Sequence, residues 1–405
     1  MASPAIKPAP EAHPTRPALG ELEDRLERIE DAGLTRTLRP IGPVNTPHIT
    51  IDGRACLLMA SNDYLGLNRH PRLAEAALES ALTEGTGTGA SRLISGTLDA
   101  HAALEKDIAQ FKHAQAALFM ATGYMTNLAV ITGLAGPGDL IVSDDLNHAS
   151  IIDACRLSRA QVKIYPHRDA ATAAKLLQGN HGQLKLLVTD GVFSMDGDLA
   201  PLPQLLPAAQ EAGALLVVDD AHGTGVWGPT GRGTVEHFGI TPPDDLVMVG
   251  TFSKALGGQG GFCAASDLVI RTLVNQARPF LYSTAPPPSQ IAAARAALRL
   301  VDDEPVLRHH LSNLCARLRA GIEDLGLSVA SSQGPIVPVL VGETRRTLAL
   351  AKALLMRNVY VPAIRPPTVP DGTCRLRFTV TAAHTQEDID QAIAALASAI
   401  KEVGL

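Results

Sequence analysis

The chain has few aromatic residues, no paired cysteines and no long apolar run. Aromatic side chains make up 3% of its 405 residues. Its cysteines are odd in number, scattered and without a CxxC pair: Cys56, Cys155, Cys263, Cys315 and Cys374. This set excludes a disulfide framework and a zinc site built on cysteine pairs, and it indicates a reducing compartment.

A surplus of basic charge is also missing. The net charge is −6 and the pI is about 6.1, which argues against a nucleic-acid partner, because such proteins need a concentrated basic face. No apolar run reaches the roughly 18 residues of a membrane helix, and the N-terminus has no hydrophobic signal core. We therefore expect a cytoplasmic protein that binds neither nucleic acid nor membrane.

The composition is that of an ordinary globular protein, and the chain is too long for a single small core. Hydrophobic residues make up 46%, and the length predicts one large domain plus a smaller one. Residues 1–20 carry repeated prolines among alanines and are predicted to be disordered. Residues 21–34 predict an amphipathic helix with Leu22, Leu26 and Ile29 on one face.

A lysine in a glycine-rich turn is the first candidate for chemistry. Residues 247–249 predict a short buried strand, and Lys254 follows among small residues and glycine pairs. Thr251 and Ser253 flank the lysine with hydroxyls that suit an anion such as phosphate. The alternative is a solvated loop lysine, since most lysines are exposed.

A carboxylate and a histidine end a second buried strand. Residues 215–218 predict a parallel strand that leads into Asp219 and, three residues later, His222. Ligands of open α/β sheets bind at the carboxyl ends of the strands. Pyridoxal phosphate needs a ring-nitrogen partner and a Schiff-base lysine, and Asp219 and Lys254 supply these residue types. Asp219 could instead cap a helix.

Further strands lead into small or polar residues. Residues 116–127 predict a strand followed by Gly123 and Tyr124 at a helix start, where backbone amides can bind phosphate. The strand within 139–150 leads to His148. The strand within 184–198 leads to Ser194, which is not an esterase nucleophile because the G-x-S-x-G pattern is absent.

The glycine-rich stretch 85–92 predicts a loop over the site rather than a dinucleotide-binding turn. A helix over residues 71–83 precedes these glycines, whereas a dinucleotide fingerprint follows a strand.

These motifs together resemble a known family. Asp219-x-x-His222, Thr251-Phe-Ser-Lys254 and Asn147-His-Ala-Ser150 are similar to the α-oxoamine synthases, from about Leu57 to the C-terminus. The resemblance implies an α/β fold of the aspartate-aminotransferase type (pyridoxal-phosphate fold type I). The large domain would hold a mostly parallel sheet. It also implies a homodimer with active sites at the subunit interface. The predicted parts are a disordered N-terminus (1–20), a helical arm (21–56), a large cofactor-binding domain (57–285) and a smaller C-terminal α/β domain (286–405).

The resemblance also implies roles around pyridoxal phosphate. Lys254 would carry the cofactor and move the α-proton, Asp219 would hold the ring nitrogen protonated, and His148 would stack on the ring and face the substrate. The remaining cofactor residues would contact the phenolic oxygen or the phosphate, the last of them across the subunit interface: His222, Ser194, Gly123, Tyr124, Thr251 and Thr284.

Substrate residues follow from the same resemblance. Arg377 would bind the amino-acid carboxylate, because arginine pairs bidentately with carboxylates, whereas its neighbour Arg375 favours a surface ion pair. Asn62 would face the substrate or serve its own turn. The acyl substrate would contact Thr368 and either Arg36 or, as the second choice, Arg39.

The implied reaction is an acyl transfer without a metal. Within the family, the chain is most similar to the biotin-pathway branch, which joins L-alanine to a pimeloyl thioester on acyl carrier protein or coenzyme A. The sequence does not distinguish the two carriers. Sister synthases that join glycine or serine to another acyl-coenzyme A share the cofactor residues and stay open, as do an aminotransferase or lyase and a non-enzymatic regulator of the same fold.

Overall fold

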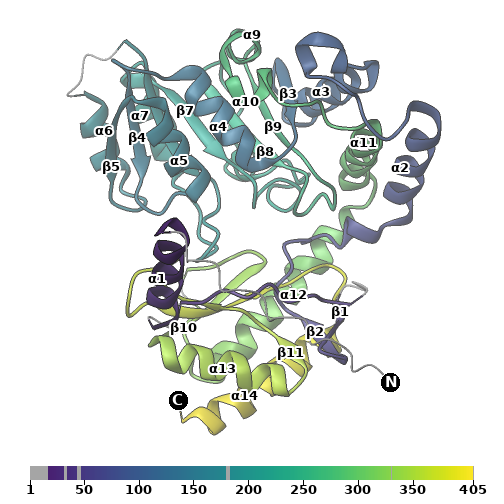
Figure 1. Ribbon diagram of the computed structural model, residues 1–405, viewed down its shortest axis with the longest axis vertical. Coiled ribbons are helices and arrows are strands. Elements are labelled where there is room, and N and C mark those ends of the chain that lie inside the picture. The colour runs from purple at the N-terminus through teal and green to yellow at the C-terminus, as the bar shows by residue number, and fades with distance from the viewer. Residues whose placement is uncertain (1–16, 32–33, 43–46, 179–182, 330, 405) are drawn as a thin grey trace, which may run out of the picture.

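The chain forms two lobes, one built on a seven-stranded sheet and the other on two three-stranded sheets (Figure 1). This computed structural model describes residues 17–31, 34–42, 47–178, 183–329 and 331–404. Most of the predicted disordered segment, residues 1–16, lies outside the described residues.

The larger lobe contains a sheet of seven strands in the order β3-β9-β8-β7-β6-β4-β5. β9 runs antiparallel to both of its neighbours, and the other pairs in this sheet are parallel. The predicted mostly parallel α/β sheet is confirmed. The strands are β3 (Ala116–Met120), β4 (Leu140–Asp144), β5 (Gln161–Tyr165), β6 (Lys185–Asp190), β7 (Leu215–Asp219), β8 (Leu246–Thr251) and β9 (Gly261–Ala265).

Helices cover both faces of this sheet, which is why its strands read as continuous apolar runs. Neighbouring residues of a strand point to opposite faces. On β7, Val217 packs in the cluster that includes residues of α4, α5 and α9, whereas Val218 packs with residues of α3, α6, α7 and α11. The helices of this lobe are α2 (Pro71–Glu84), α3 (Asp99–Phe111), α4 (Gly123–Leu134), α5 (Ala149–Ser158), α6 (Ala170–Gln178), α7 (Leu202–Glu211), α8 (Thr234–His237), α9 (Asp267–Gln276), α10 (Arg278–Leu281) and α11 (Pro288–Asp303), with short turns at η1 (Leu67–Arg69) and η2 (Arg92–Gly96).

The smaller lobe combines C-terminal elements with two N-terminal strands. One sheet has the order β10-β13-β12 and the other β1-β2-β11. β2 pairs in parallel with β11, with Leu57 opposite Val359. The elements are β1 (His48–Ile51), β2 (Arg54–Leu58), α12 (Pro305–Glu323), β10 (Ile336–Gly342), α13 (Thr344–Met356), β11 (Val359–Tyr360), β12 (Ala363–Ile364), β13 (Cys374–Thr379) and α14 (Gln386–Val403).

Two of the predicted domain boundaries do not coincide with the points at which the chain passes from one lobe to the other. Residue 57 lies inside β2, which belongs to the smaller lobe's sheet. The proline-rich turn at 286–288 leads into α11, and that helix packs on α2 and α3 of the larger lobe. The chain therefore returns to the smaller lobe after α11, as Figure 1 shows.

The N-terminal helix α1 begins earlier than expected, at Pro17, and ends at Asp31. Proline is favoured in the first turn of a helix, where its missing N–H has no intrahelical partner. Residues 17–20, expected to be disordered, are therefore helical. Leu22, Leu26 and Ile29 form an apolar face whose side chains are 51%, 66% and 42% exposed.

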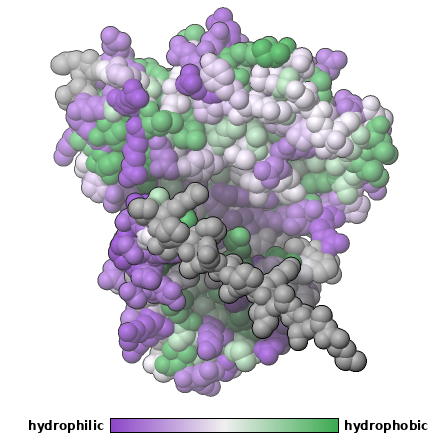
Figure 2. All heavy atoms as spheres, in the orientation of Figure 1, coloured by the Kyte–Doolittle hydropathy of each residue, from purple (hydrophilic) through white to green (hydrophobic). Residues whose placement is uncertain are grey.

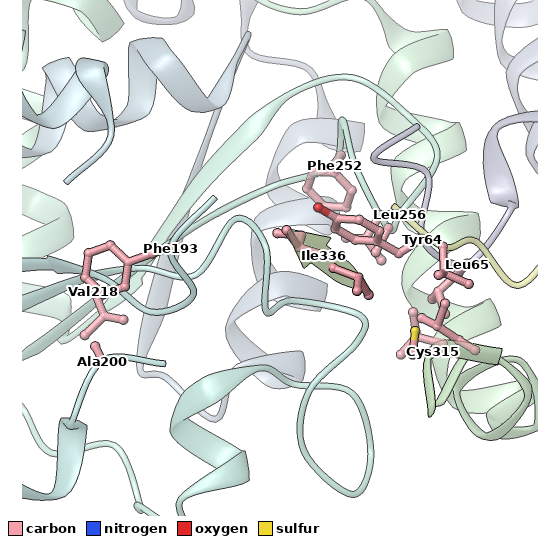
Figure 3. Close-up of a cluster of buried hydrophobic side chains, with 14 of the residues drawn as sticks. Tyr64, Leu65, Phe193, Ala200, Val218, Phe252, Leu256, Cys315 and Ile336 are labelled. Carbon is pink, nitrogen blue, oxygen red and sulfur yellow. The ribbon is translucent and has the colours of Figure 1, made fainter. Parts of the chain in front are cut away.

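The apolar core is continuous between the lobes. Figure 3 shows Tyr64, Leu65 and Leu256 close to Cys315 of α12 and Ile336 of β10. This shared core fixes the segment around Tyr64 against both lobes. All five cysteines are buried and free. Within the described ranges, no helix is both long enough and apolar enough to span a membrane.

Candidate active site

The carboxyl ends of neighbouring parallel strands bring the predicted residues to one edge of the large sheet. Asp219 ends β7, Asp190 ends β6 directly beside it, and Lys254 follows β8. His148 follows β4 and caps α5. This edge faces the smaller lobe, and Figure 2 shows hydrophilic residues in the recess between the lobes.

Lys254 is held in a desolvated, charged environment. Its Nζ lies 2.8 Å from Nε2 of His222. Burial lowers the pKa of Lys254 to about 8, although the carboxylates of Asp219 and Asp190 oppose this effect. A lysine with this pKa is partly unprotonated near neutral pH, which an exposed loop lysine would not be.

Asp219 is buried at the end of β7 and held by an asparagine. Its Oδ2 accepts a hydrogen bond of 2.6 Å from Nδ2 of Asn127, and its Oδ1 accepts one of 3.0 Å from the backbone N–H of Ala221. No helix begins here, so Asp219 is not a helix cap. The Asn127 Oδ1 is buried without a hydrogen-bond partner. An acceptor left open beside a carboxylate fits a bound group with a polar N–H or O–H.

The adjacent Asp220 has a different environment. It forms an ion pair of 2.9 Å with Lys112, and the two side chains are 0% and 1% exposed. It also accepts a hydrogen bond of 2.7 Å from the Thr234 hydroxyl. The Asp220 carboxylate is thus satisfied inside the larger lobe, whereas Asp219 is the one near Lys254.

His148 is the N-cap of α5 and lies near Asp219. Its Nδ1 lies 2.7 Å from the Ser150 hydroxyl, and its backbone N–H donates to Asp190 at 2.9 Å. Desolvation lowers the pKa of His148, and the charge of Asp219 opposes that shift. Burial and the charge of Asp219 raise the pKa of Asp190 well above its usual value.

The predicted phosphate site lies at the start of α4. The first amides of a helix have no intrahelical partner, and they attract anions. A Cβ on Gly123 would lie 3.2 Å from the Cβ of Thr251, so this residue has little room for a side chain. The Thr251 hydroxyl lies 2.7 Å from Oγ of Ser253 and 2.7 Å from the Gly260 carbonyl oxygen. Tyr124 is 44% exposed, and its hydroxyl donates to Asp153.

Arg377 reaches the same site from β13 of the smaller lobe. Its Nε donates to the Ser194 carbonyl at 2.6 Å, and both of its Nη atoms donate to Oδ1 of Asn62 at 3.3 Å. Ser194 therefore contacts Arg377 through its backbone. Arg375, expected at the surface, is instead buried in an ion pair with Asp196.

The residues predicted to contact the acyl substrate or the partner subunit's cofactor are not among the buried residues around Lys254. The side chains of Arg36, Arg39, Thr284 and Thr368 are exposed, and the structure of one chain brings none of them into hydrogen-bond contact with Lys254. Arg365, in the turn that carries Thr368, donates to the Thr35 carbonyl at 3.3 Å. The segments of Arg36 and Thr368 are therefore neighbours.

Three residues of the site were missed in the sequence. Asp190 follows a buried strand as Asp219 does, so the same pattern could have identified it. Asn127 stands four residues after Gly123, one turn into α4. Tyr64, whose hydroxyl lies 2.6 Å from Nδ1 of His222, gives no signal in the sequence beyond its place near Asn62.

These residues fit pyridoxal phosphate. The site combines an amine of lowered pKa, a buried carboxylate, a helix start lined by hydroxyls and an arginine from the other lobe. Among the described residues, no group of three or more His, Cys, Asp or Glu side chains could hold a metal ion.

The chain is similar over most of its length to a known family and to solved structures. The family model "Aminotransferase class I and II" matches residues 54–396. A relative from Geobacter sulfurreducens named 8-amino-7-oxononanoate synthase is 48% identical over 394 residues, which cover 96% of this chain and 100% of the relative. A relative of the same name from Marinobacter nauticus is 50% identical over 373 residues, covering 92% and 94%. A solved serine palmitoyltransferase with pyridoxal phosphate is 30% identical with a TM-score of 0.89, covering 96% of this chain and 98% of that one. The chain therefore belongs to the class I and II aminotransferase family and, within it, to the α-oxoamine synthases.

Proposed function

We propose that this protein joins L-alanine to a pimeloyl thioester and gives 8-amino-7-oxononanoate. One molecule of CO₂ leaves from the alanine carboxylate, and the thiol leaves from the thioester. The observation that carries the proposal is the meeting of Lys254, Asp219 and Arg377 from three strands in one site. Full-length relatives of about half identity that carry this name support the choice of substrates.

The proposed cofactor is pyridoxal phosphate, which supplies an electron sink for the bonds broken at the α-carbon. Lys254 would bind it, and Asp219, held by Asn127, would place a negative charge at its ring nitrogen. The amides at the start of α4, with Thr251, would hold its phosphate. His148 and His222 would flank its ring, Ser194 and Tyr124 would lie beside them, and Thr284 would reach the partner subunit's cofactor.

The protein's own groups would then orient the amino acid. Arg377 is buried and donates from two sides of its guanidinium, so it can bind the alanine carboxylate in a fixed direction. With the carboxylate fixed, the amine of Lys254 can remove the α-proton. Its lowered pKa keeps part of this amine unprotonated and ready to accept that proton.

The acyl thioester would enter between the lobes. The neighbouring segments of Arg36 and Thr368 suit a contact with the acyl chain, and Asn62 stands beside Arg377 at the inner end. Either acyl carrier protein or coenzyme A could carry the acyl group. The exposed apolar face of α1 and the exposed Thr284 favour a homodimer with shared active sites. A cytoplasmic location remains a prediction.

A sister synthase is the second candidate. The serine palmitoyltransferase fold superposes on this chain with a TM-score of 0.89, so the backbone alone does not separate the two activities. The two activities differ in the amino acid and the acyl group, so the part of the site that binds these substrates decides between them.

Product stoichiometry tests the proposal. With L-alanine and pimeloyl-coenzyme A or the carrier-protein thioester, we expect equal amounts of amino ketone, CO₂ and free thiol. Lys254→Ala is the negative control and should retain the fold. Transamination would release neither CO₂ nor thiol, so amino transfer without these products would contradict the proposal.

A further inference from the structure

The buried Tyr64 contacts both His222, which lies beside Lys254, and Asn62, which lies beside Arg377. Tyr64 lies on the segment after β2 and is 0% exposed. Figure 3 shows its ring beside Leu256, with the hydroxyl oxygen pointing away from Leu65 and Cys315. That oxygen lies 2.6 Å from Nδ1 of His222 and 3.2 Å from Oδ1 of Asn62.

The single phenolic proton has one better acceptor. A contact of 2.6 Å is a strong O–H···N hydrogen bond, whereas 3.2 Å is at the long end for a hydroxyl donor. Oδ1 of Asn62 also already faces both Nη atoms of Arg377. Burial raises the pKa of Tyr64 to about 12, so the phenol keeps its proton. The hydroxyl therefore donates to Nδ1 of His222.

This donation decides where His222 carries its own proton. Burial, and then the charges of Lys254 and Arg377, lower the pKa of His222 well below its usual value, so the ring is neutral. A neutral imidazole has one N–H, and an Nδ1 that accepts leaves that N–H at Nε2. Nε2 lies 2.8 Å from Nζ of Lys254, which can accept this N–H in its unprotonated form.

We propose that Tyr64 is a positioning residue that holds His222 as an Nε2–H donor toward the Lys254 nitrogen. The donor stabilises the unprotonated form of that nitrogen, which is the form that accepts a proton. The inference rests on the proposed function only for the role of Lys254, because the tautomer of His222 is a property of the chain itself.

Other charged groups also shift the pKa of Lys254, so the test must leave these residues in place. The charged and titratable side chains that face it come from β6, β7, β13 and the start of α5: Asp190, Asp219, Arg377 and His148. Tyr64→Phe replaces none of them and keeps the ring that packs in the core, although the Tyr64 hydroxyl also contacts Arg377. Tyr165→Phe is the matched control, since Tyr165 is also 0% exposed and makes no hydrogen bond to His222.

The first experiment is ¹⁵N NMR of the full chain labelled at histidine, recorded above pH 8, where the Lys254 amine is mostly unprotonated, with His222 assigned by its loss in His222→Asn. We expect the proton on Nε2 in the wild type. A proton on Nδ1 would overturn the proposal, and this result needs no Tyr64 variant to fold.

The second experiment is the pH titration of the visible absorbance of the enzyme loaded with pyridoxal phosphate, in which the Nε2–H of His222 would face the lysine-derived nitrogen or the phenolic oxygen beside it. Loss of one hydrogen bond should raise the midpoint by about half to one pH unit in Tyr64→Phe and leave it unchanged in Tyr165→Phe. In a His222→Asn background, Tyr64→Phe should add nothing, because it acts through His222. An unchanged midpoint in the single variant, or a full shift in that background, would refute the role of Tyr64. Turnover of L-alanine, assayed in parallel, separates this outcome from a failure of the proposed function.

Discussion

Asp219 receives a 2.6 Å hydrogen bond from Asn127, while its neighbour Asp220 is paired with Lys112 at 2.9 Å. Consecutive residues at a strand end point in opposite directions, so one of two adjacent carboxylates faces the site and the other faces the interior. The two residues are therefore expected to respond differently to the same substitution.

Asp219→Asn should reduce turnover by at least about 10²-fold with little change in stability, because it removes the charge at the cofactor ring. Asp220→Asn is the matched control. It breaks a buried ion pair, which costs about 3–5 kcal/mol of unfolding free energy, and it leaves the site charge in place. Rate measurements and denaturant unfolding of both variants check this. Equal rate losses in the two folded variants would contradict the assignment.

Arg377→Lys should raise the KM for alanine and slow exchange of the alanine α-proton with solvent. Lysine lacks the planar fork that orients a carboxylate. Arg375→Lys serves as the control, because Arg375 pairs with Asp196 and should affect stability more than KM. The exchange is followed by NMR in deuterated buffer. An unchanged KM in Arg377→Lys would move the carboxylate site elsewhere.

His167 predicts a pH dependence of stability. Burial lowers its pKa, but hydrogen bonds to Asp144 and Asp198 outweigh this effect and raise it to about 9. A raised pKa means that the stabilisation is fully present below the unfolded value of about 6.5 and is lost as the pH rises through about 9. The melting temperature of the wild type should fall between pH 7 and 10 more than that of His167→Gln. Parallel curves for the two proteins would exclude this contribution.

The elements that carry the chemistry could largely be predicted from sequence, because their signals are local. The helix expected over 71–83 is α2, Pro71–Glu84. The expected strands before Asp219 and Lys254 are β7 and β8, which are neighbours in the sheet. The carboxyl ends of parallel strands lie at the same edge of a sheet, so the residues that follow them come together there.

Contacts between distant segments could not be predicted in this way. Arg375 is buried because Asp196, 179 residues away, lies opposite it. Nothing near Asp220 indicates that Lys112, 108 residues earlier, neutralises it. β2 pairs with β11 in the smaller lobe, and the segment that leads from β2 toward the larger lobe places Tyr64 between His222 and Asn62. Each of these contacts depends on how the two lobes fold together.

The central claim is the choice of L-alanine and a pimeloyl thioester, and a competition assay tests it most directly. The values of kcat/KM are measured for L-alanine, L-serine and glycine, each with pimeloyl-, acetyl-, succinyl- and palmitoyl-coenzyme A. The pair of L-alanine and pimeloyl thioester is expected to be fastest, with L-serine and acetyl-coenzyme A far behind. Faster turnover of glycine or serine with one of the other thioesters would contradict the claim and assign the chain to a sister synthase.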